Sequence, residues 1–493
     1  MIPRSTAPPL PSGIVAFVKR DCPTCELVTP VLAQIAKQAS LTVYTQDDPG
    51  FPPGVEAVDD TSLAVSWHHD IETVPTLLRV QDGEERERTL GWHRGDWEAL
   101  TGVSGLGPEL PEMRPGCGSL SVAPDRTAEL AVKFEGSALR ARRLELASLE
   151  DPNEAMFDRG WTDGLPVVPP TEARVLAMLK GTTRAPHEVV AVVPPDLVEC
   201  TVEKVAINAV MAGCAPEYLP VVLAAVEAAC TDTFNMHGLL ATTMPVGPVI
   251  IVNGPIGQRI GMNAGRNVFG QGNRANSTIG RALQLVVRNV GGGRPGDIDC
   301  ATHGNPGKVG FCFAEDEEGS PWEPLSVHRG LDPGVDAVTL FPGEGPRCVI
   351  DQLSRDPDSL ARSFAASLRA LYHPKLVLGF DCILAIAPDH ARVFQEAGWD
   401  RARLSGRLFE LLQIPGQELR RGAGDMAEGM PEGKTGQALG LPASLAGLTL
   451  PKFKPGGLLI VHCGGGAGLF SSIIGGWVSG AIGSEPVTRE IQP

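Results

Sequence analysis

The stretch IVAFVKRDCPTCELVTPVLAQIAKQA, residues 14–39, decides how the N-terminal part of the chain folds. Its first five residues form an apolar run typical of a short buried strand. The residues after the second cysteine recur at helical spacing, with an apolar face of Leu27, Val31, Leu32 and Ile35. Cys22 and Cys25 therefore lie at a strand-to-helix junction. Because the free N–H groups and the dipole of a helix N-terminus stabilise a thiolate, we expect Cys22 to be the nucleophile and Cys25 the resolving thiol.

Further strands follow this unit. LTVYTQD (41–47) predicts a second strand, and HHDIETVPTLLRVQDGEERERTLGW (68–92) predicts two more, joined by a turn at Asp82 and Gly83.

The stretch from about residue 13 to 102 resembles a thioredoxin-like domain. Cys-x-x-Cys opens a helix, Pro30 follows the second cysteine by five residues, and TVPTLL matches the segment that carries the family's cis-proline. The resemblance implies a redox-active disulfide between Cys22 and Cys25, and it implies that Pro75 is the cis-proline facing the dithiol.

Two other interpretations of the cysteine pair stay open. The fold could keep an inert, structural dithiol. The pair could also hold a metal, although a zinc site needs two more ligands, and His68 and His69 are the only candidates close in sequence.

Composition narrows the function classes. The chain has 493 residues, is 43% hydrophobic, and carries a formal net charge of -16. Such an acidic protein is unsuited to nucleic acid and to an anionic membrane surface. We find no signal-peptide pattern and no long apolar run, and the eleven cysteines are spread along the chain, so we expect a cytoplasmic protein with mostly reduced thiols.

The pattern predicts an α/β protein with three parts: a thioredoxin-like dithiol domain over 1–103, a linker and connecting helix over 104–150, and a large α/β substrate-binding or catalytic domain over 151–493, which could comprise two subdomains. In the linker, glycines flank Cys117 and leave its thiol approachable, so we expect a redox relay between Cys117 and Cys22. The Gly-Cys-Gly-Ser stretch faintly resembles uncharacterised bacterial proteins with cysteine or selenocysteine at this position.

The large domain contains a loop rich in Gly, Asn and Arg between an apolar strand and an amphipathic helix, over residues 247–293. Glycine backbones, a helix N-terminus and arginines together suit a carboxylate or phosphate. We expect a small anionic substrate here, held by Asn263, Arg266, Asn267, Asn273, Arg274 and Asn276, with the helix starting near Ser277. A structural loop held together by asparagine side chains is the alternative.

Cys214, just before a helical turn, is a further catalytic candidate, with a buried structural thiol as the alternative. Secondary candidates are Cys463 before three glycines, Glu315 in an acidic cluster, His303, and His390 beside Asp389 at a strand-to-helix junction. The structural alternatives are close helix-strand packing for Cys463, a solvated acidic turn for the stretch that holds His303 and Glu315, and a helix cap for His390.

These patterns predict a thiol-dependent redox enzyme whose dithiol serves the large domain during reduction or thiolate-assisted bond cleavage. No cofactor beyond the redox-active disulfide is evident, and we expect no metal. Expected partners are the anionic substrate and a thioredoxin reductase or low-molecular-weight thiol; association into a homo-oligomer stays open. The alternatives are a protein that binds or traffics copper, zinc or mercury, and a lyase or hydrolase with the thioredoxin-like part as scaffold.

Overall fold

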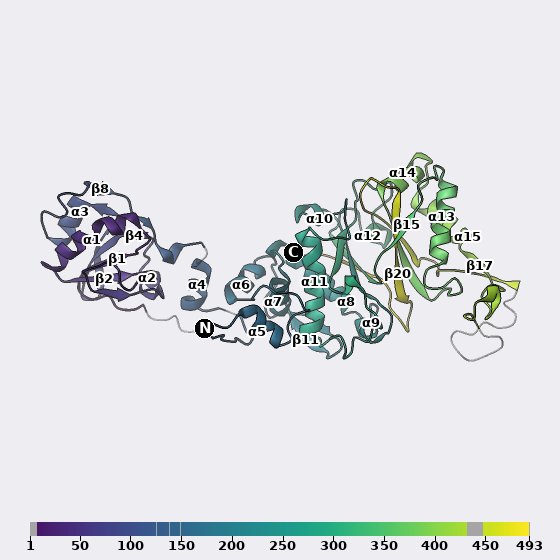
Figure 1. The fold of residues 1–493 in the computed structure, drawn as a ribbon, viewed down its shortest axis with the longest axis horizontal. Coiled ribbons are helices and arrows are strands. Elements are labelled where there is room, and N and C mark those ends of the chain that lie inside the picture. The colour runs from purple at the N-terminus through teal and green to yellow at the C-terminus, as the bar shows by residue number, and fades with distance from the viewer. Residues whose placement is uncertain (1–6, 125, 138, 148, 431–446, 493) are drawn as a thin grey trace. The chain divides into compact units, whose positions relative to one another are not determined.

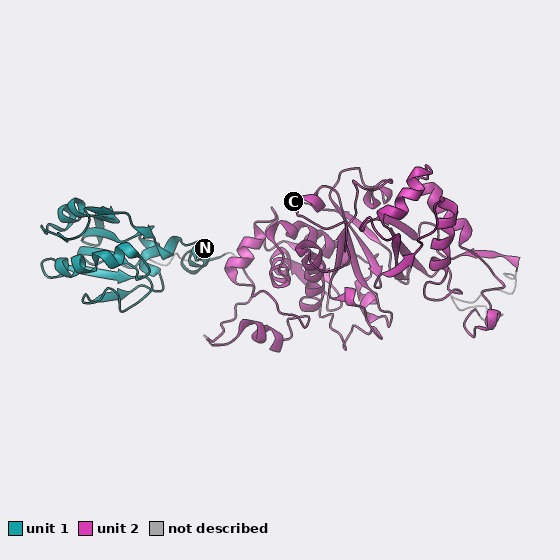
Figure 2. Ribbon diagram, turned by 45° about the horizontal axis from the view of Figure 1, so that its top comes forward, with its two compact units in different colours: residues 1–138 teal, residues 139–493 magenta. Residues whose placement is uncertain are grey.

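The computed structural model describes residues 7–492 except 125, 138, 148 and 431–446. The chain divides into two compact units, unit 1 (Met1–Ala138) and unit 2 (Leu139–Pro493) (Figure 2). Both units combine helices with β-sheets, which confirms the predicted α/β class. No helix in the described ranges is long and apolar enough to cross a membrane.

Unit 1 is built on a five-stranded sheet in the order β3-β2-β1-β5-β6. Strands β1, β2 and β3 run parallel, and β5 and β6 are antiparallel additions. The sheet strands are β1 (Gly13–Val18), β2 (Leu41–Thr45), β3 (Ala57–Asp59), β5 (Thr76–Gln81) and β6 (Glu84–Leu90). The helices are α1 (Pro23–Ala36), α2 (Ala64–His68), α3 (Arg94–Thr101) and α4 (Thr127–Glu135) (Figure 1). This is the thioredoxin-like arrangement expected for the N-terminal part.

Two short strand pairings outside the five-stranded sheet attach the following chain to unit 1. Strand β8 (Met113–Arg114) pairs with β7 (Trp92–His93), and β9 (Cys117–Gly118) pairs with β4 (Thr73–Val74). A 3-10 turn, Leu120–Val122, follows β9. We call residues 113–121 the strap. The sequence pattern predicts a linker here, but backbone pairing and side-chain hydrogen bonds make the strap part of unit 1. The strap sequence has no apolar periodicity from which this packing could be predicted.

Unit 2 is built on an eight-stranded sheet whose main path runs β13-β12-β14-β20-β16-β19. Its strands are β12 (Gly247–Asn253), β13 (Phe311–Ala314), β14 (Ala337–Gly343), β15 (Arg347–Ile350), β16 (Phe380–Ile386), β19 (Leu458–His462), β20 (Phe470–Val478) and β21 (Val487–Glu490). Two separate antiparallel strand pairs are β10 (Val189–Val193) with β11 (Val198–Thr201), and β17 (Gln413–Pro415) with β18 (Thr449–Pro451).

The large sheet consists of two halves with the same topology. In the first, β12 pairs in parallel with β13 and antiparallel with β14; in the second, β16 pairs in parallel with β19 and antiparallel with β20. The halves meet where β14 contacts β20 at Gly343 and Gly476. The last strand of each half pairs with a strand of the other half: β15 pairs with β20, and β21 pairs with β14.

Helices cover the outer face of each half, and Figure 1 shows α8 and α11 on one side of the sheet and α13 and α15 on the other. The helices of unit 2 are α5 (Pro152–Asp158), α6 (Glu172–Leu179), α7 (Val202–Ala212), α8 (Leu219–Ala229), α9 (Met236–Ala241), α10 (Ile256–Arg259), α11 (Arg274–Asn289), α12 (Leu325–His328), α13 (Pro357–Arg369), α14 (Pro388–Glu396) and α15 (Arg401–Leu411). The inner faces share one apolar cluster that includes Phe313 of β13 and Val461 of β19. Because these strands end the main path, the sheet must curl until its two ends approach, and Asp316 N–H donates to His462 O at 2.8 Å.

Candidate active site

The cysteine pair of unit 1 lies where the sequence predicted it, between β1 and α1. Cys22 is the N-cap of α1, and its Sγ accepts a hydrogen bond from the backbone N–H of Cys25 at 3.4 Å. Pro23 occupies the first turn of the helix, where a missing N–H costs nothing. Pro30 lies inside the same helix. The geometry thus places one sulfur at the positive end of the helix dipole.

The surroundings of the two thiols shift their pKa values in opposite directions. Hydrogen bonds to the Cys22 sulfur, first from the Cys25 thiol and then from the Cys117 thiol and backbone N–H groups, lower the pKa of Cys22 to about 5 in spite of burial. Burial and the hydrogen bond to Cys22 raise the pKa of Cys25. At neutral pH, Cys22 is therefore a thiolate and Cys25 a thiol, which is the asymmetry expected of a nucleophile and a resolving thiol.

Pro75 and Cys117 complete the surroundings of Cys22. The Val74–Pro75 peptide bond is cis, as the resemblance implied. The carbonyl of Val74 lies 3.5 Å from Cys22 Sγ, and Val74 pairs directly with Cys117 across β4 and β9. Burial and the neighbouring Cys22 raise the pKa of Cys117. Three cysteines of unit 1 are thus brought together around the N-terminus of α1.

The thiol candidates of unit 2 are in different surroundings. Cys214 Sγ donates to the carbonyl of Thr278 at 3.4 Å, and burial raises the pKa of Cys214 to about 12. Cys463 is buried at the end of β19, and desolvation raises its pKa as well. Neither sulfur is stabilised as a thiolate: burial outweighs the charges of Arg274 and Arg281 near Cys214, and the carboxylates of Glu315 and Asp316 raise the pKa of Cys463 further.

The asparagines of the 263–276 loop mainly bond to its backbone. Asn263 N–H donates to Asn276 Oδ1 at 3.0 Å, and Asn276 Nδ2 donates back to Asn263 O at 2.8 Å. Asn273 is the N-cap of α11, which begins at Arg274 and not near Ser277, because the Asn273 side chain accepts from Asn276 N–H. Asn267 Nδ2 donates to Gln271 O.

The arginines of this region differ in what they bind. Arg281 makes a two-pronged ion pair with Asp163, both distances 2.7 Å. Arg274 donates to the carbonyls of Gly213 and Cys214. Within the described part of the chain, no acceptor lies within hydrogen-bond distance of the exposed Arg266 guanidinium. Arg266 is therefore the arginine of the loop that is available to a ligand.

Arg266 lines a cleft of about 400 Å³. The cleft joins two segments that are far apart in sequence, the loop 266–270 and the glycine-rich loop 463–467 after β19. Gly464 N–H donates to Ala264 O at 2.8 Å, and a Cβ on Gly465 would lie 2.5 Å from Arg266 Cγ, so the two loops pack closely. Ala387, the N-cap of α14, also lines the cleft and offers no capping side chain. The free N–H groups of α14 thus begin beside this cleft.

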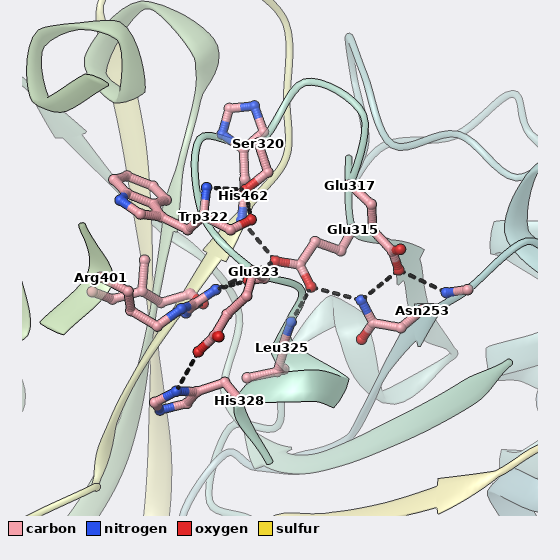
Figure 3. Close-up of polar contacts among 12 residues, drawn as sticks. Asn253, Glu315, Glu317, Ser320, Trp322, Glu323, Leu325, His328, Arg401 and His462 are labelled. Carbon is pink, nitrogen blue, oxygen red and sulfur yellow. Dashed lines mark hydrogen bonds and ion pairs between the residues drawn. The ribbon is translucent and has the colours of Figure 1, made fainter. Parts of the chain in front are cut away.

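Glu315 belongs to a separate, buried polar cluster (Figure 3). Its carboxylate accepts from Asn253 Nδ2 and from Leu325 N–H, both at 2.7 Å, and more weakly from His462 N–H at 3.4 Å. Arg401 approaches it to 4.0 Å. Burial raises the pKa of Glu315. These contacts tie the ends of β12, β13 and β19 to the start of α12, so Glu315 has a clear architectural role.

The two histidine candidates lie apart from each other. His303 is exposed. His390 is fully buried in α14, with Nδ1 2.8 Å from Ser471 Oγ, and Nε2–H donates to the carbonyl of Asp351 at 3.0 Å. Among the described residues, no group of three or more His, Cys, Asp or Glu side chains has an arrangement that could hold a metal ion.

A sulfur with a lowered pKa at a helix N-terminus, a second cysteine one turn on and a neighbouring cis-proline form a dithiol site on a thioredoxin-like fold, which supports a thiol redox role. Over 78 residues, the chain is 30% identical to thioredoxin H-type 1 of Nicotiana tabacum, a match covering 16% of this chain and 54% of that protein. The chain thus spans about half the length of this curated relative. No family model and no solved structure matches the chain. The thioredoxin-like segment is supported by both sequence and fold, and no comparison reaches unit 2.

Proposed function

We propose that the protein is a thiol-dependent redox enzyme in which Cys22 and Cys25 of unit 1 exchange electrons as a reversible disulfide, and in which unit 2 binds a small anionic substrate. The observation that carries the proposal is that the pKa values of two neighbouring thiols shift in opposite directions. The pKa of Cys22 is lowered to about 5, and the pKa of Cys25 is raised. A purely structural dithiol has no need of this asymmetry.

The substrate site of the proposal is the cleft between loops 266–270 and 463–467. Its Arg266 lacks a partner in the described chain, and the N-terminus of α14 adds positive potential. The one nearby acid in the first turn of α14, Asp389, is paired with Arg392 at 3.4 Å. A carboxylate or phosphate fits these donors, and the reaction would be a reduction or a thiolate-assisted bond cleavage.

Redox titration of the full chain tests the first part. Equilibration in buffers of defined thiol–disulfide ratio, followed by acid quenching and peptide mapping, is expected to give a Cys22–Cys25 disulfide that forms and disappears reversibly. A pair that stays reduced under every oxidant would overturn the redox role, and retention of one equivalent of copper, zinc or mercury by the same pair would favour metal binding.

A matched pair of arginine variants tests the second part. With inorganic phosphate and acetate as probes, we expect Arg266→Ala to lose roughly ten- to a hundred-fold in affinity, the equivalent of one charge-assisted hydrogen bond. Arg274→Ala is the control, because its guanidinium is already bound to the carbonyls of Gly213 and Cys214. Equal affinity of wild type and Arg266→Ala for both probes would exclude this cleft as the anion site.

A further inference from the structure

The strap lies along the edge of β4 immediately beside the dithiol. Strand β9 pairs antiparallel with β4, with Cys117 opposite Val74 and Gly118 opposite Thr73. The approach is so close that a Cβ on Gly116 would lie 2.4 Å from Thr73 Cγ2 and 2.8 Å from Val74 O. The strap therefore occupies the backbone groups that an incoming extended peptide would use to add a strand next to Pro75.

Hydrogen bonds on both sides of Cys117 hold the strap in place. Before it, the hydroxyl of Thr24, one of the two residues between the cysteines of the motif, donates to Pro115 O at 2.8 Å. After it, Ser119 N–H donates to Glu72 O at 2.9 Å, and the buried side chain of Gln46 donates to Ser119 Oγ at 2.7 Å. The anchors include the active-site motif itself, so the strap and the dithiol form one structure.

Burial then distinguishes the three thiols. Cys22 is 1% exposed and Cys25 is fully buried, whereas Cys117 is only partly buried. Of the three cysteines, Cys117 is thus the residue most exposed to a reactant in solution, whereas Cys22 and Cys25 are covered. Cys117 in turn lies within reach of Cys22, because Cys22 Sγ is 3.5 Å from the carbonyl of the residue that pairs with Cys117.

We propose that Cys117 is the entry thiol of this site, that its external reactant is a small, low-molecular-weight disulfide, and that the strap excludes protein disulfides from Cys22. This inference rests on the redox role of Cys22 and Cys25 proposed above and assigns its substrate class.

The steps balance as two-electron thiol–disulfide exchange. The Cys117 thiol passes its proton to the Cys22 thiolate and attacks a disulfide RS–SR; the Cys117–SR bond forms, and the departing RS⁻ takes the proton back from Cys22. The Cys22 thiolate then attacks Cys117 Sγ, which forms the Cys22–Cys117 disulfide and releases a second RS⁻ that is protonated by water. Finally, Cys25 attacks Cys22 Sγ, the Cys22–Cys25 disulfide forms, and Cys117 leaves with the proton of Cys25. The dithiol is oxidised and RS–SR becomes two RSH; an external low-molecular-weight thiol or dithiol must reduce the enzyme again.

The experiment uses the reduced full chain, oxidised glutathione as the small disulfide, and intact-mass measurement with peptide mapping. We expect Cys22→Ser to retain one glutathione on Cys117, Cys25→Ser to trap a Cys22–Cys117 disulfide without glutathione, and Cys117→Ser to form the Cys22–Cys25 disulfide at least ten-fold more slowly than wild type. Cys300→Ser, at an exposed cysteine, is the matched control and is expected to behave as wild type.

A second variant tests the exclusion of proteins. Thr24→Val removes the hydrogen bond to Pro115 at nearly constant volume, and we expect it to raise the rate of insulin reduction, driven by dithiothreitol, several-fold above that of wild type. Equal rates for Cys117→Ser and wild type with oxidised glutathione would overturn the entry role while leaving the redox role intact. Rapid reduction of insulin by the wild type would overturn the exclusion. Failure of the wild type to form a Cys22–Cys25 disulfide with any oxidant would remove the redox role and this inference together.

Discussion

The titration of Cys22 is the most direct measure of what the site does. At pH 7, a thiol with a pKa of about 5 is ~99% thiolate, whereas an unperturbed cysteine with a pKa near 8.5 is about 3% thiolate. Thiolate absorbance at 240 nm, recorded on reduced protein from pH 4 to 10 as the difference between wild type and Cys22→Ser, is therefore expected to show a midpoint near pH 5. Cys117→Ala removes one of the donors to the sulfur. Because a charge-assisted hydrogen bond contributes at least about 1.5 kcal/mol and one pKa unit is about 1.4 kcal/mol, this variant is expected to raise the midpoint by about one unit.

The same shift has a consequence for stability. The pKa of Cys22 is lower in the folded protein than in the unfolded chain, so the thiolate stabilises the reduced fold fully above about pH 8.5, and this contribution is lost as the pH falls through about 5. Denaturant unfolding of reduced wild type should therefore lose more stability between pH 8.5 and pH 5 than unfolding of Cys22→Ser. A midpoint at or above pH 7, or the same pH dependence for both proteins, would refute the assignment of Cys22 as a stabilised thiolate.

Two further predictions concern unit 2. Arg281→Ala leaves the mostly buried carboxylate of Asp163 without its two-pronged partner. We therefore expect a loss of about 3 kcal/mol in the free energy of unfolding, measured with urea. Arg266→Ala, at an exposed side chain, is the control and should change the free energy of unfolding by less than about 0.5 kcal/mol. Glu315→Gln replaces a carboxylate oxygen that accepts two hydrogen bonds, so we expect one donor to face the new amide N–H₂ and a loss of about 2 kcal/mol by the same assay; a loss below 0.5 kcal/mol would contradict the architectural role of Glu315.

Local signals in the sequence predicted the dithiol well. The apolar run, the helical spacing and the cysteines all lie within 14–39, so the strand-to-helix junction that places Cys22 at the start of α1 is local in sequence. The pairing of Cys117 with Val74 could not be predicted from the sequence, because β9 has only two residues and therefore shows no alternation of apolar and polar residues. The glycines on either side of Cys117 predict an approachable thiol, whereas in the structure Gly116 allows close backbone contact with β4.

The candidate site of unit 2 could be predicted only in part, because it depends on contacts between segments far apart in sequence. The loop 263–276 is rich in donors, and the sequence cannot tell whether those donors meet a ligand or the loop's own carbonyls; Asn263 and Asn276 bind each other's backbone, and Arg266 is left available. The cleft beside Arg266 needs a second loop almost two hundred residues away, at 463–467. No local pattern connects these segments, because only the curling of the sheet brings them together.

The exchange of last strands between the two halves of unit 2 bears on how this unit unfolds. Strand β15 is covalently part of the first half but completes the edge of β20, and β21 is part of the second half but pairs with β14. Neither half can therefore satisfy its own backbone hydrogen bonds in isolation, and opening one half exposes strand edges in the other. We therefore expect the two halves to unfold in a single cooperative transition, and a cleavage of the chain between β15 and α13 would leave two pieces that each carry a strand the other requires.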